Sequence, residues 1–316
     1  MSTLQKKIAR VAVSAASFVK NETLVTELRQ LGVEVSLNTL GRVMSKDELI
    51  QFWRECRPDA AIVGTETIDR AVLDAAPSLR LIAKYGVGLD NIDEAALTHR
   101  SVRLGWTGGV NKRAVAELVL AFALGHFRNA SASVDLMRRG QWVKDGGVQL
   151  SNLRVGIVGF GHVGTDLAGL LRAFGSEVVC HDIVDKSREA AQLGARQVSY
   201  DELLKSSDMV TFHVPGTALT RGMFGARELE IVKASALVLN TSRGSVIDFA
   251  GATNAVLTGK LGGLAVDVYP SEPYQLSPEL AGCSRIYCTP HIGGNTREAV
   301  LAMGRSAIAH IRDALI

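Results

Sequence analysis

Three side chains suited to binding an anion and moving a proton lie in the last third of the chain: Arg243, Glu272 and His291. Each follows a short apolar run that is typical of a buried strand in a parallel sheet. These runs cover residues 237–240, 264–268 and 286–288. Ligands of open α/β sheets bind at the carboxyl ends of the strands, so the three side chains are expected to face one crevice.

A glycine-rich turn with the spacing Gly-x-Gly-x-x-Gly begins at Gly159 and follows another strand-like apolar run. Gly159 would allow a tight turn, Gly161 a close approach to a pyrophosphate, and Gly164 close packing of helix on strand. The amides at the helix start, including those of His162 and Val163, would face the phosphates. In this context the turn predicts a dinucleotide-binding site.

An acidic residue completes the dinucleotide pattern. Asp182 ends the next strand-like run, 18 residues after Gly164. A carboxylate there can accept hydrogen bonds from the adenosine ribose and would repel a 2′-phosphate. Ile183 and Val184 follow it, so no Arg stands where a 2′-phosphate would need one. This favours NAD over NADP.

Strand-type runs alternate with helix-type runs along the chain, which predicts an α/β fold with parallel sheets covered by helices. At roughly 150 residues per domain, 316 residues make about two domains. We expect two doubly wound parallel-sheet domains. One is an inserted Rossmann dinucleotide-binding domain over 103–289. The other is a flavodoxin-like substrate domain formed by 1–102 and 290–316. One long helix is predicted over 112–139, and an amphipathic helix over 296–316.

Composition excludes several classes of protein. Apolar residues make up 47% of the chain, and the net charge is only +3. Aromatic residues make up 5%, which is few for base stacking, so no nucleic-acid partner is expected. No membrane segment, no leader at the polar N-terminus and no metal-ligand spacing are recognised. The four cysteines are expected to be reduced thiols of a cytoplasmic protein.

The motifs, in this order, resemble the NAD-dependent D-2-hydroxyacid dehydrogenases, especially their phosphoglycerate-dehydrogenase-like branch. Further matching segments cover residues 86–93, 110–117 and 213–215. The resemblance covers nearly the whole chain and implies that Arg243, Glu272 and His291 are catalytic. It implies hydride transfer between NAD(H) and a small 2-hydroxy or 2-oxo acid. The domain count would leave no residues for the C-terminal regulatory domain of longer phosphoglycerate dehydrogenases.

The chemistry of 2-oxo acid reduction assigns a role to each catalytic residue. His291 would be the acid/base, Glu272 would orient its ring, and Arg243 would bind the substrate. By the resemblance, Asp267 would hold the nicotinamide carboxamide. The resemblance also implies further cofactor contacts from Val87, Val214, Thr241, Arg243, His291, Gly293 and Gly294.

The substrate carboxylate is expected on the glycine-rich loop Gly86-Val87-Gly88, whose successive amides can bind an anion. Lys84 would keep one cation there. The chain departs from the phosphoglycerate enzymes at Gly64, where they carry an Arg, and Glu66 adds a negative charge. A dianionic phosphate would lose a bidentate partner and meet repulsion. We therefore hypothesise that 3-phosphoglycerate is not the preferred substrate.

Two alternatives remain within this resemblance. One is a glyoxylate or hydroxypyruvate reductase, and the other is a non-catalytic, NAD-sensing binding protein on the same scaffold. The expected partners are a small-molecule acid and a second copy of the chain. The resemblance implies a homodimer with the 112–139 helix at its interface.

Overall fold

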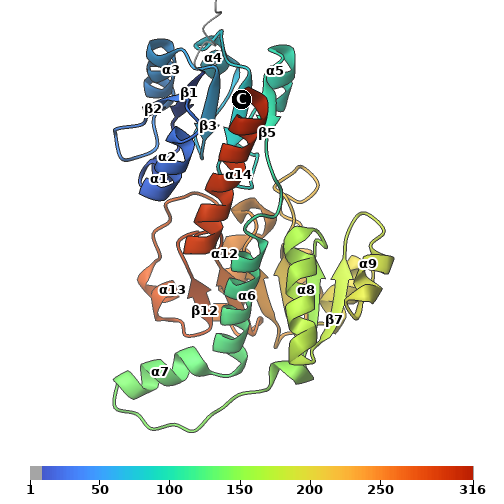
Figure 1. Cartoon of the computed structure of the whole chain (residues 1–316). Coiled ribbons are helices and arrows are strands. Elements are labelled where there is room, and N and C mark those ends of the chain that lie inside the picture. The colour runs from blue at the N-terminus through green and yellow to red at the C-terminus, as the bar shows by residue number, and fades with distance from the viewer. Residues whose placement is uncertain (1–8, 316) are drawn as a thin grey trace, which may run out of the picture. The chain divides into compact units, whose positions relative to one another are not determined.

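The computed structural model describes residues 9–315, which fold as two compact units (Figure 1). The first unit comprises the chain up to Asn111 and again from Arg297, and the second spans Lys112–Thr296. The sequence placed these boundaries at 102/103 and 289/290. The polar N-terminal segment, residues 1–8, lies outside the described residues, as does Ile316.

The first unit is built on a five-stranded parallel sheet with the order β2-β1-β3-β4-β5. This order is that of the flavodoxin-like doubly wound fold. Its strands are β1 (Arg10–Val13), β2 (Glu34–Leu37), β3 (Ala60–Val63), β4 (Leu81–Lys84) and β5 (Arg103–Gly105). Its helices are α1 (Ala16–Val19), α2 (Glu22–Arg29), α3 (Lys46–Cys56), α4 (Arg70–Asp74), α5 (Glu94–His99) and α14 (Arg297–Leu315).

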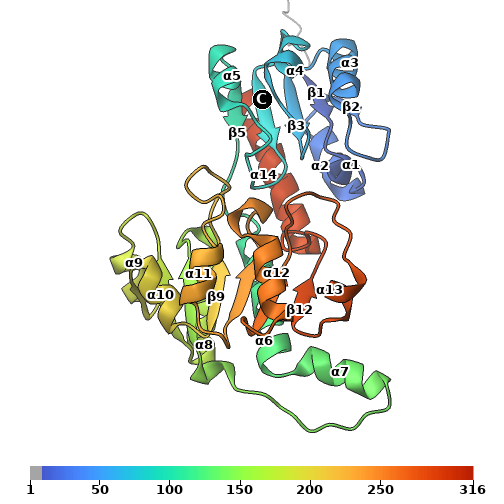
Figure 2. The same ribbon diagram turned by 180° about the vertical axis from the view of Figure 1, so that it is seen from behind.

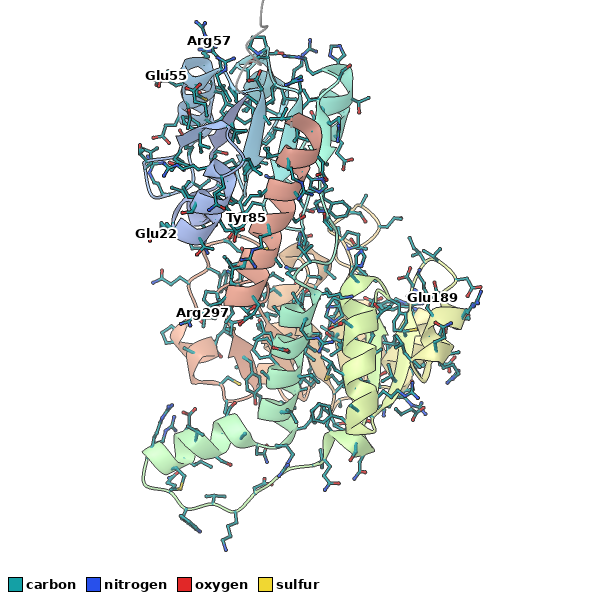
Figure 3. The ribbon with its side chains drawn as sticks, in the orientation of Figure 1. Glu22, Glu55, Arg57, Tyr85, Glu189 and Arg297 are labelled. Atoms are coloured by element: carbon teal, nitrogen blue, oxygen red, sulfur yellow. The ribbon has the colours of Figure 1, made fainter. Side chains whose placement is uncertain are left out.

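Side chains alternate across this sheet into two apolar cores. Ala61 and Val63 of β3 pack with α3, α4 and α5, whereas Ile62 packs with α1, α2 and α14 on the other face. The second core continues past β4 to Tyr85 (Figure 3). The Tyr85 ring packs edge-on against Phe18, with centroids 5.5 Å apart. Helix α14 therefore completes the first unit, although it is the last element of the chain.

The second unit contains a seven-stranded parallel sheet with the order β12-β11-β10-β9-β6-β7-β8. The strand order reverses between β6 and β9, as in dinucleotide-binding sheets. Its strands are β6 (Arg154–Val158), β7 (Glu177–His181), β8 (Ala195–Gln197), β9 (Met209–Phe212), β10 (Leu237–Asn240), β11 (Gly263–Val266) and β12 (Ile286–Cys288). Its α-helices are α6 (Lys112–Phe127), α7 (Ala130–Arg138), α8 (His162–Phe174), α9 (Ser187–Gln192), α10 (Tyr200–Ser206), α11 (Ala226–Ile231), α12 (Phe249–Leu257) and α13 (Pro278–Gly282). Two short 3₁₀ turns are η1 (Leu150–Asn152) and η2 (Gly244–Val246).

Helices cover both faces of the seven-stranded sheet. Helices α6 and α8 pack on one face, and α10, α11 and α12 pack on the other (Figure 2). Val155 and Ile157 of β6 point to the first core, and Val158 points to the second. The predicted fold class is thus confirmed, with an inserted Rossmann unit and a flavodoxin-like unit.

The single helix predicted over 112–139 is wrong. The structure has α6 and α7 in its place, separated at Asn129, whose φ of 49° is left-handed and ends the helical path. Helix α6 packs its apolar side chains into the core, whereas α7 buries no residue. The helix propensity of the residues is similar throughout this region, so the sequence does not indicate the break. The burial of α6, and not local preference, decides where the helix ends.

No helix within residues 9–315 is both long enough and apolar enough to be a candidate membrane span.

Candidate coenzyme site and catalytic pair

The glycine loop after β6 has a geometry that only glycine satisfies at two positions. Gly159 has a φ of 91°, and a Cβ there would lie 2.4 Å from the carbonyl oxygen of His213. A Cβ on Gly164 would lie 2.2 Å from the carbonyl oxygen of Gly159. Both distances are far below van der Waals contact, so the loop turns tightly and α8 packs directly against it. A side chain at either position would push the loop off the sheet.

The surroundings of Gly161 fit a bound pyrophosphate. Gly161 is the N-cap of α8, and a Cβ there would meet no atom within 4 Å. The first amides of the helix, those of His162 and Val163, carry the positive end of the helix dipole. The loop also lies at the β6/β9 reversal, where nucleotides bind in open sheets.

Asp182 joins the end of β7 to the glycine loop. Its Oδ2 accepts a hydrogen bond of 2.7 Å from the Phe160 amide, and its Oδ1 accepts one of 3.1 Å from the Val184 amide. Each carboxylate oxygen can accept more than one bond, so ribose hydroxyls can be bound in addition. The half-buried side chain is therefore held in place before any ligand arrives.

Further residues predicted to touch the coenzyme follow β9 and β10. The half-buried Val214 packs on the glycine loop, with a side-chain atom 2.8 Å from where a Gly159 Cβ would be. The Thr241 hydroxyl is buried and has no hydrogen-bond partner among the described residues. Burial lowers the pKa of the neighbouring His213 to about 3, so its ring is neutral at physiological pH.

His291 and Glu272 form a hydrogen-bonded pair at the same edge of the sheet. The His291 Nδ1 lies 2.7 Å from Glu272 Oε2, and Glu272 Oε1 accepts a bond of 3.1 Å from the Tyr269 amide. A carboxylate only accepts, so Nδ1 carries a proton and Nε2 is the nitrogen that can exchange one with a ligand. The His291 side chain is 52% exposed, which leaves it accessible to a substrate.

Arg243 is placed by the turn that follows β10. The Asn240 side chain donates a bond of 2.8 Å to the carbonyl oxygen of Arg243, and Arg243 Nη1 donates one of 2.7 Å to the carbonyl oxygen of Ser242. Asn240 is fully buried, so the turn is anchored in the sheet. Arg243 is half-buried, and its guanidinium is a permanently charged group of the kind that binds carboxylates.

Asp267 anchors the segment that carries His291. Its carboxylate is 1% exposed and accepts hydrogen bonds of 2.6–2.7 Å from the Thr289 hydroxyl and from the Ile292 and Gly293 amides. His291 lies between these donors with a left-handed φ of 54°, a conformation that is strained for a residue with a side chain. The three bonds hold it there. The resemblance implied only a contact from Asp267 to the nicotinamide, and this anchoring role was not foreseen.

The predicted substrate loop belongs to the other unit, at the carboxyl end of β4. Gly86 has a φ of 129°, and a Cβ there would lie 3.5 Å from Lys84 Cε. Lys84 is 5% exposed, and its Nζ donates bonds to the carbonyl oxygen of Gly64 and to Asn91 Oδ1. Lys84 therefore ties the loops after β3 and β4 together beneath the glycines.

Fourteen of the predicted coenzyme and catalytic residues lie in the unit 112–296, and the substrate loop, with Val87, lies in the other. Those of the first group are Gly159, Gly161, His162, Val163, Gly164, Asp182, Val214, Thr241, Arg243, Asp267, Glu272, His291, Gly293 and Gly294. Those of the second are Lys84, Gly86, Val87 and Gly88. Within residues 9–315, no group of three acidic, His or Cys side chains is placed to hold a metal ion.

Comparison with known proteins agrees with this geometry. Residues 120–293 match the family model described as "D-isomer specific 2-hydroxyacid dehydrogenase, NAD binding domain". The chain belongs to the D-2-hydroxyacid dehydrogenase family. Residues 120–293 of this family member are accordingly an NAD-binding domain, and its cofactor is NAD.

Relatives place the chain in the phosphoglycerate-dehydrogenase-like branch of the family. It is 34% identical over 288 residues to D-3-phosphoglycerate dehydrogenase of Archaeoglobus fulgidus, covering 90% of this chain and 54% of that protein. The chain thus spans about half the length of that relative. It is 36% identical over 244 residues to glyoxylate reductase of Thermococcus litoralis, covering 74% and 73% of the two chains. The structure of a glyoxylate reductase from Paecilomyes thermophila superposes with a TM-score of 0.84 at 26% identity, covering 98% and 96%.

Asp267→Asn is predicted to destabilise the protein by about 1–3 kcal/mol, because an amide cannot accept from all three donors and leaves a buried N–H unpaired. Urea unfolding measures this. Asp201→Asn is the matched control. Its carboxylate pairs with Arg227 at the surface, and its loss should change stability by less than about 1 kcal/mol. Equal stability of the two variants would contradict the anchoring role of Asp267.

Proposed function

We propose that the protein is an NAD-dependent 2-hydroxyacid dehydrogenase that interconverts a small 2-hydroxy acid and its 2-oxo acid. The observation that carries this proposal is the His291–Glu272 pair, at the same sheet edge as the dinucleotide loop. An accessible imidazole oriented by a carboxylate can act as the general acid and base of alcohol–ketone interconversion. We assign coenzyme binding to the predicted domain 103–289 and substrate binding to 1–102 with 290–316.

The chain's own residues supply binding and proton transfer. Bound NAD supplies or accepts the hydride at the substrate's second carbon. His291 Nε2 gives a proton to the oxygen in reduction and takes it back in oxidation, while Glu272 holds Nδ1 protonated and stabilises the imidazolium. Arg243 binds the substrate through its charged donors. The Gly86–Gly88 amides receive the carboxylate.

His291→Ala is predicted to lower kcat by about 10²–10⁴, the usual contribution of general acid–base catalysis. The measurement is loss of NADH absorbance with a panel of 2-oxo acids. NADH should still bind, as followed by fluorescence, because the loop at Gly159 is untouched. His99→Ala, at an exposed position at the end of α5, is the control and should keep full activity.

A near-normal rate in His291→Ala would refute the proposed role. A wild type that binds NADH but reduces no 2-oxo acid would instead favour the NAD-sensing alternative.

We propose that the substrate is a 2-hydroxy acid without a phosphate group. Such a substrate is consistent with the alternative of a glyoxylate or hydroxypyruvate reductase. Glu66 is 2% exposed, and its Oε2 accepts a bond of 2.6 Å from the Gly64 amide. A Cβ on Gly64 would lie 3.2 Å from the Ala15 Cβ and 3.3 Å from Glu66 Oε2. The carboxylate therefore occupies the space into which an arginine at position 64 would have to extend.

The cation next to Glu66, Lys84, is bound to other parts of the same unit by hydrogen bonds. Lys84 Nζ bonds to the Gly64 carbonyl oxygen and to Asn91, whose amide also bonds to the backbone of Gly64 and Glu66. Relative to a neutral side chain at position 66, the Glu66 carboxylate would add repulsion to a phosphate bound on this loop. One charge at about 10 Å and an effective dielectric constant of about 20 contributes roughly 1–2 kcal/mol, or about tenfold in rate.

The Glu66→Gln variant is predicted to raise the relative kcat/KM for 3-phosphoglycerate over D-glycerate by roughly tenfold, because it removes that charge and keeps the shape. The two substrates differ only by the phosphate, so the ratio isolates its effect. Glu94→Gln, which alters an exposed carboxylate on α5, should leave the ratio unchanged. A wild type that prefers 3-phosphoglycerate, or a ratio that Glu66→Gln does not move, would contradict the proposal.

We also propose that the protein is a homodimer that functions in the cytoplasm. Helix α7 buries no residue, and about half of the Val134 and Met137 side chains is exposed. Trp142, in the following segment, is 76% exposed. This apolar surface supports the interface that the family resemblance implies. The four cysteines are free thiols, which supports a reducing compartment.

Met137→Asp is predicted to dissociate the dimer, because it places a charge in an apolar interface. Sedimentation velocity measures the change. Leu219→Asp is the control, because Leu219 is an apolar residue that is 80% exposed and lies outside α7, and this variant should remain dimeric. A monomeric wild type would refute the proposal directly.

A further inference from the structure

Tyr269 contacts the Glu272 side chain and the backbone of the two other loops, which carry Arg243 and His291. Its amide donates to Glu272 Oε1 at 3.1 Å, and its hydroxyl donates to the carbonyl oxygen of Thr289 at 2.9 Å, two residues before His291. A Cβ on Gly244 would lie 1.9 Å from the Tyr269 carbonyl oxygen, so the turn after Arg243 packs directly on the Tyr269 backbone. One residue thus sets the spacing of the three loops.

The Tyr269 ring is itself held by a second tyrosine from the Glu272 loop. The rings of Tyr269 and Tyr274 are stacked, with centroids 4.9 Å apart and planes inclined by 3°. Phe249 of α12 packs edge-on against both rings, with centroids 5.9 and 5.2 Å away. Stacked and edge-to-face arrangements of this kind are favourable and directional.

The stack matters because the loop around Glu272 has little other burial. Residues 270–279 are all exposed, and Tyr274 is the aromatic residue among them. The Tyr274 ring therefore provides an aromatic contact between this loop and the body of the unit, through Tyr269 and Phe249. Losing that contact would leave the Glu272 carboxylate held only by its bonds to the Tyr269 amide and to His291.

We propose that Tyr274 and Tyr269 form an aromatic clamp that positions the Glu272 carboxylate against His291. Both are positioning residues, since the rings act through Glu272 and through the Thr289 carbonyl. The predicted effect of the clamp on kcat rests on the proposed dehydrogenase function. The structural consequence of the clamp, the fixed orientation and tautomer of the His291 ring, holds whether or not the protein is an enzyme.

The kinetic experiment compares Tyr274→Ala with Tyr274→Phe. Misplacing a reacting group by about 1 Å can cost up to 10²-fold in rate, so Tyr274→Ala should lower kcat by roughly 10–100-fold. KM for NADH and the unfolding midpoint should stay near wild type. Tyr274→Phe keeps the stacked ring and should restore kcat. Phe174→Ala is the matched control, because Phe174 is 41% exposed and Tyr274 is 38% exposed, and it should leave kcat unchanged.

A spectroscopic experiment reads the same clamp without turnover. Long-range ¹H–¹⁵N correlation spectra of ¹⁵N-histidine-labelled protein report which ring nitrogen of neutral His291 carries the proton. In the wild type and Tyr274→Phe this should be Nδ1, which Glu272 accepts from. In Tyr274→Ala the signal should shift toward the Nε2–H tautomer that an unconstrained histidine prefers.

An unchanged tautomer in Tyr274→Ala would overturn the clamp, and so would a Tyr274→Phe variant that behaves like Tyr274→Ala. A wild type without any 2-oxo acid turnover but with the expected tautomer shift would refute the proposed dehydrogenase function and leave the clamp standing. The two failures are thus distinguishable.

Discussion

Asp267 accepts three hydrogen bonds from the segment around His291, and this buried carboxylate holds the histidine in a left-handed conformation. The chain would not adopt that conformation by local preference, because a Cβ is unfavourable there. Three charge-assisted bonds in a water-poor environment offset the strain. The direction of the His291 ring, and hence its pairing with Glu272, depends on this anchor.

The glycine loop after β6 also depends on a backbone conformation that its surroundings impose. Gly159 and Gly164 sit where a Cβ would overlap carbonyl oxygens, whereas Gly161 faces open space. Two glycines therefore build the turn, and the third leaves room for a ligand. Asp182 bonds to the Phe160 amide within that loop, so the residue expected to select the ribose also stabilises the loop that receives the phosphates.

Charge is arranged differently on the two units. In the unit that carries the catalytic pair, the half-buried Arg243 donates to the carbonyl oxygen of Ser242 in the turn after β10. In the other unit, Lys84 is buried and bonded to Gly64 and Asn91, beside the buried carboxylate of Glu66. A cation that the sequence assigned to substrate binding is therefore an internal tie between two loops.

Much of the fold and the candidate site is readable from the sequence because it depends on local signals. The glycine spacing at 159–164, the acid at 182 and the apolar runs before Arg243, Glu272 and His291 are all short-range patterns, and the resemblance to a known family rested on them. Other features depend on partners distant along the chain. The break at Asn129, the anchoring by Asp267, the burial of Lys84 and the stack of Tyr269 on Tyr274 could be seen only in three dimensions. The sequence by itself determined which residue types reach the edge of the sheet. The tertiary structure alone decided which of them are held, and in what direction, because hydrogen bonds and ring contacts between separate loops are not encoded in any one of them.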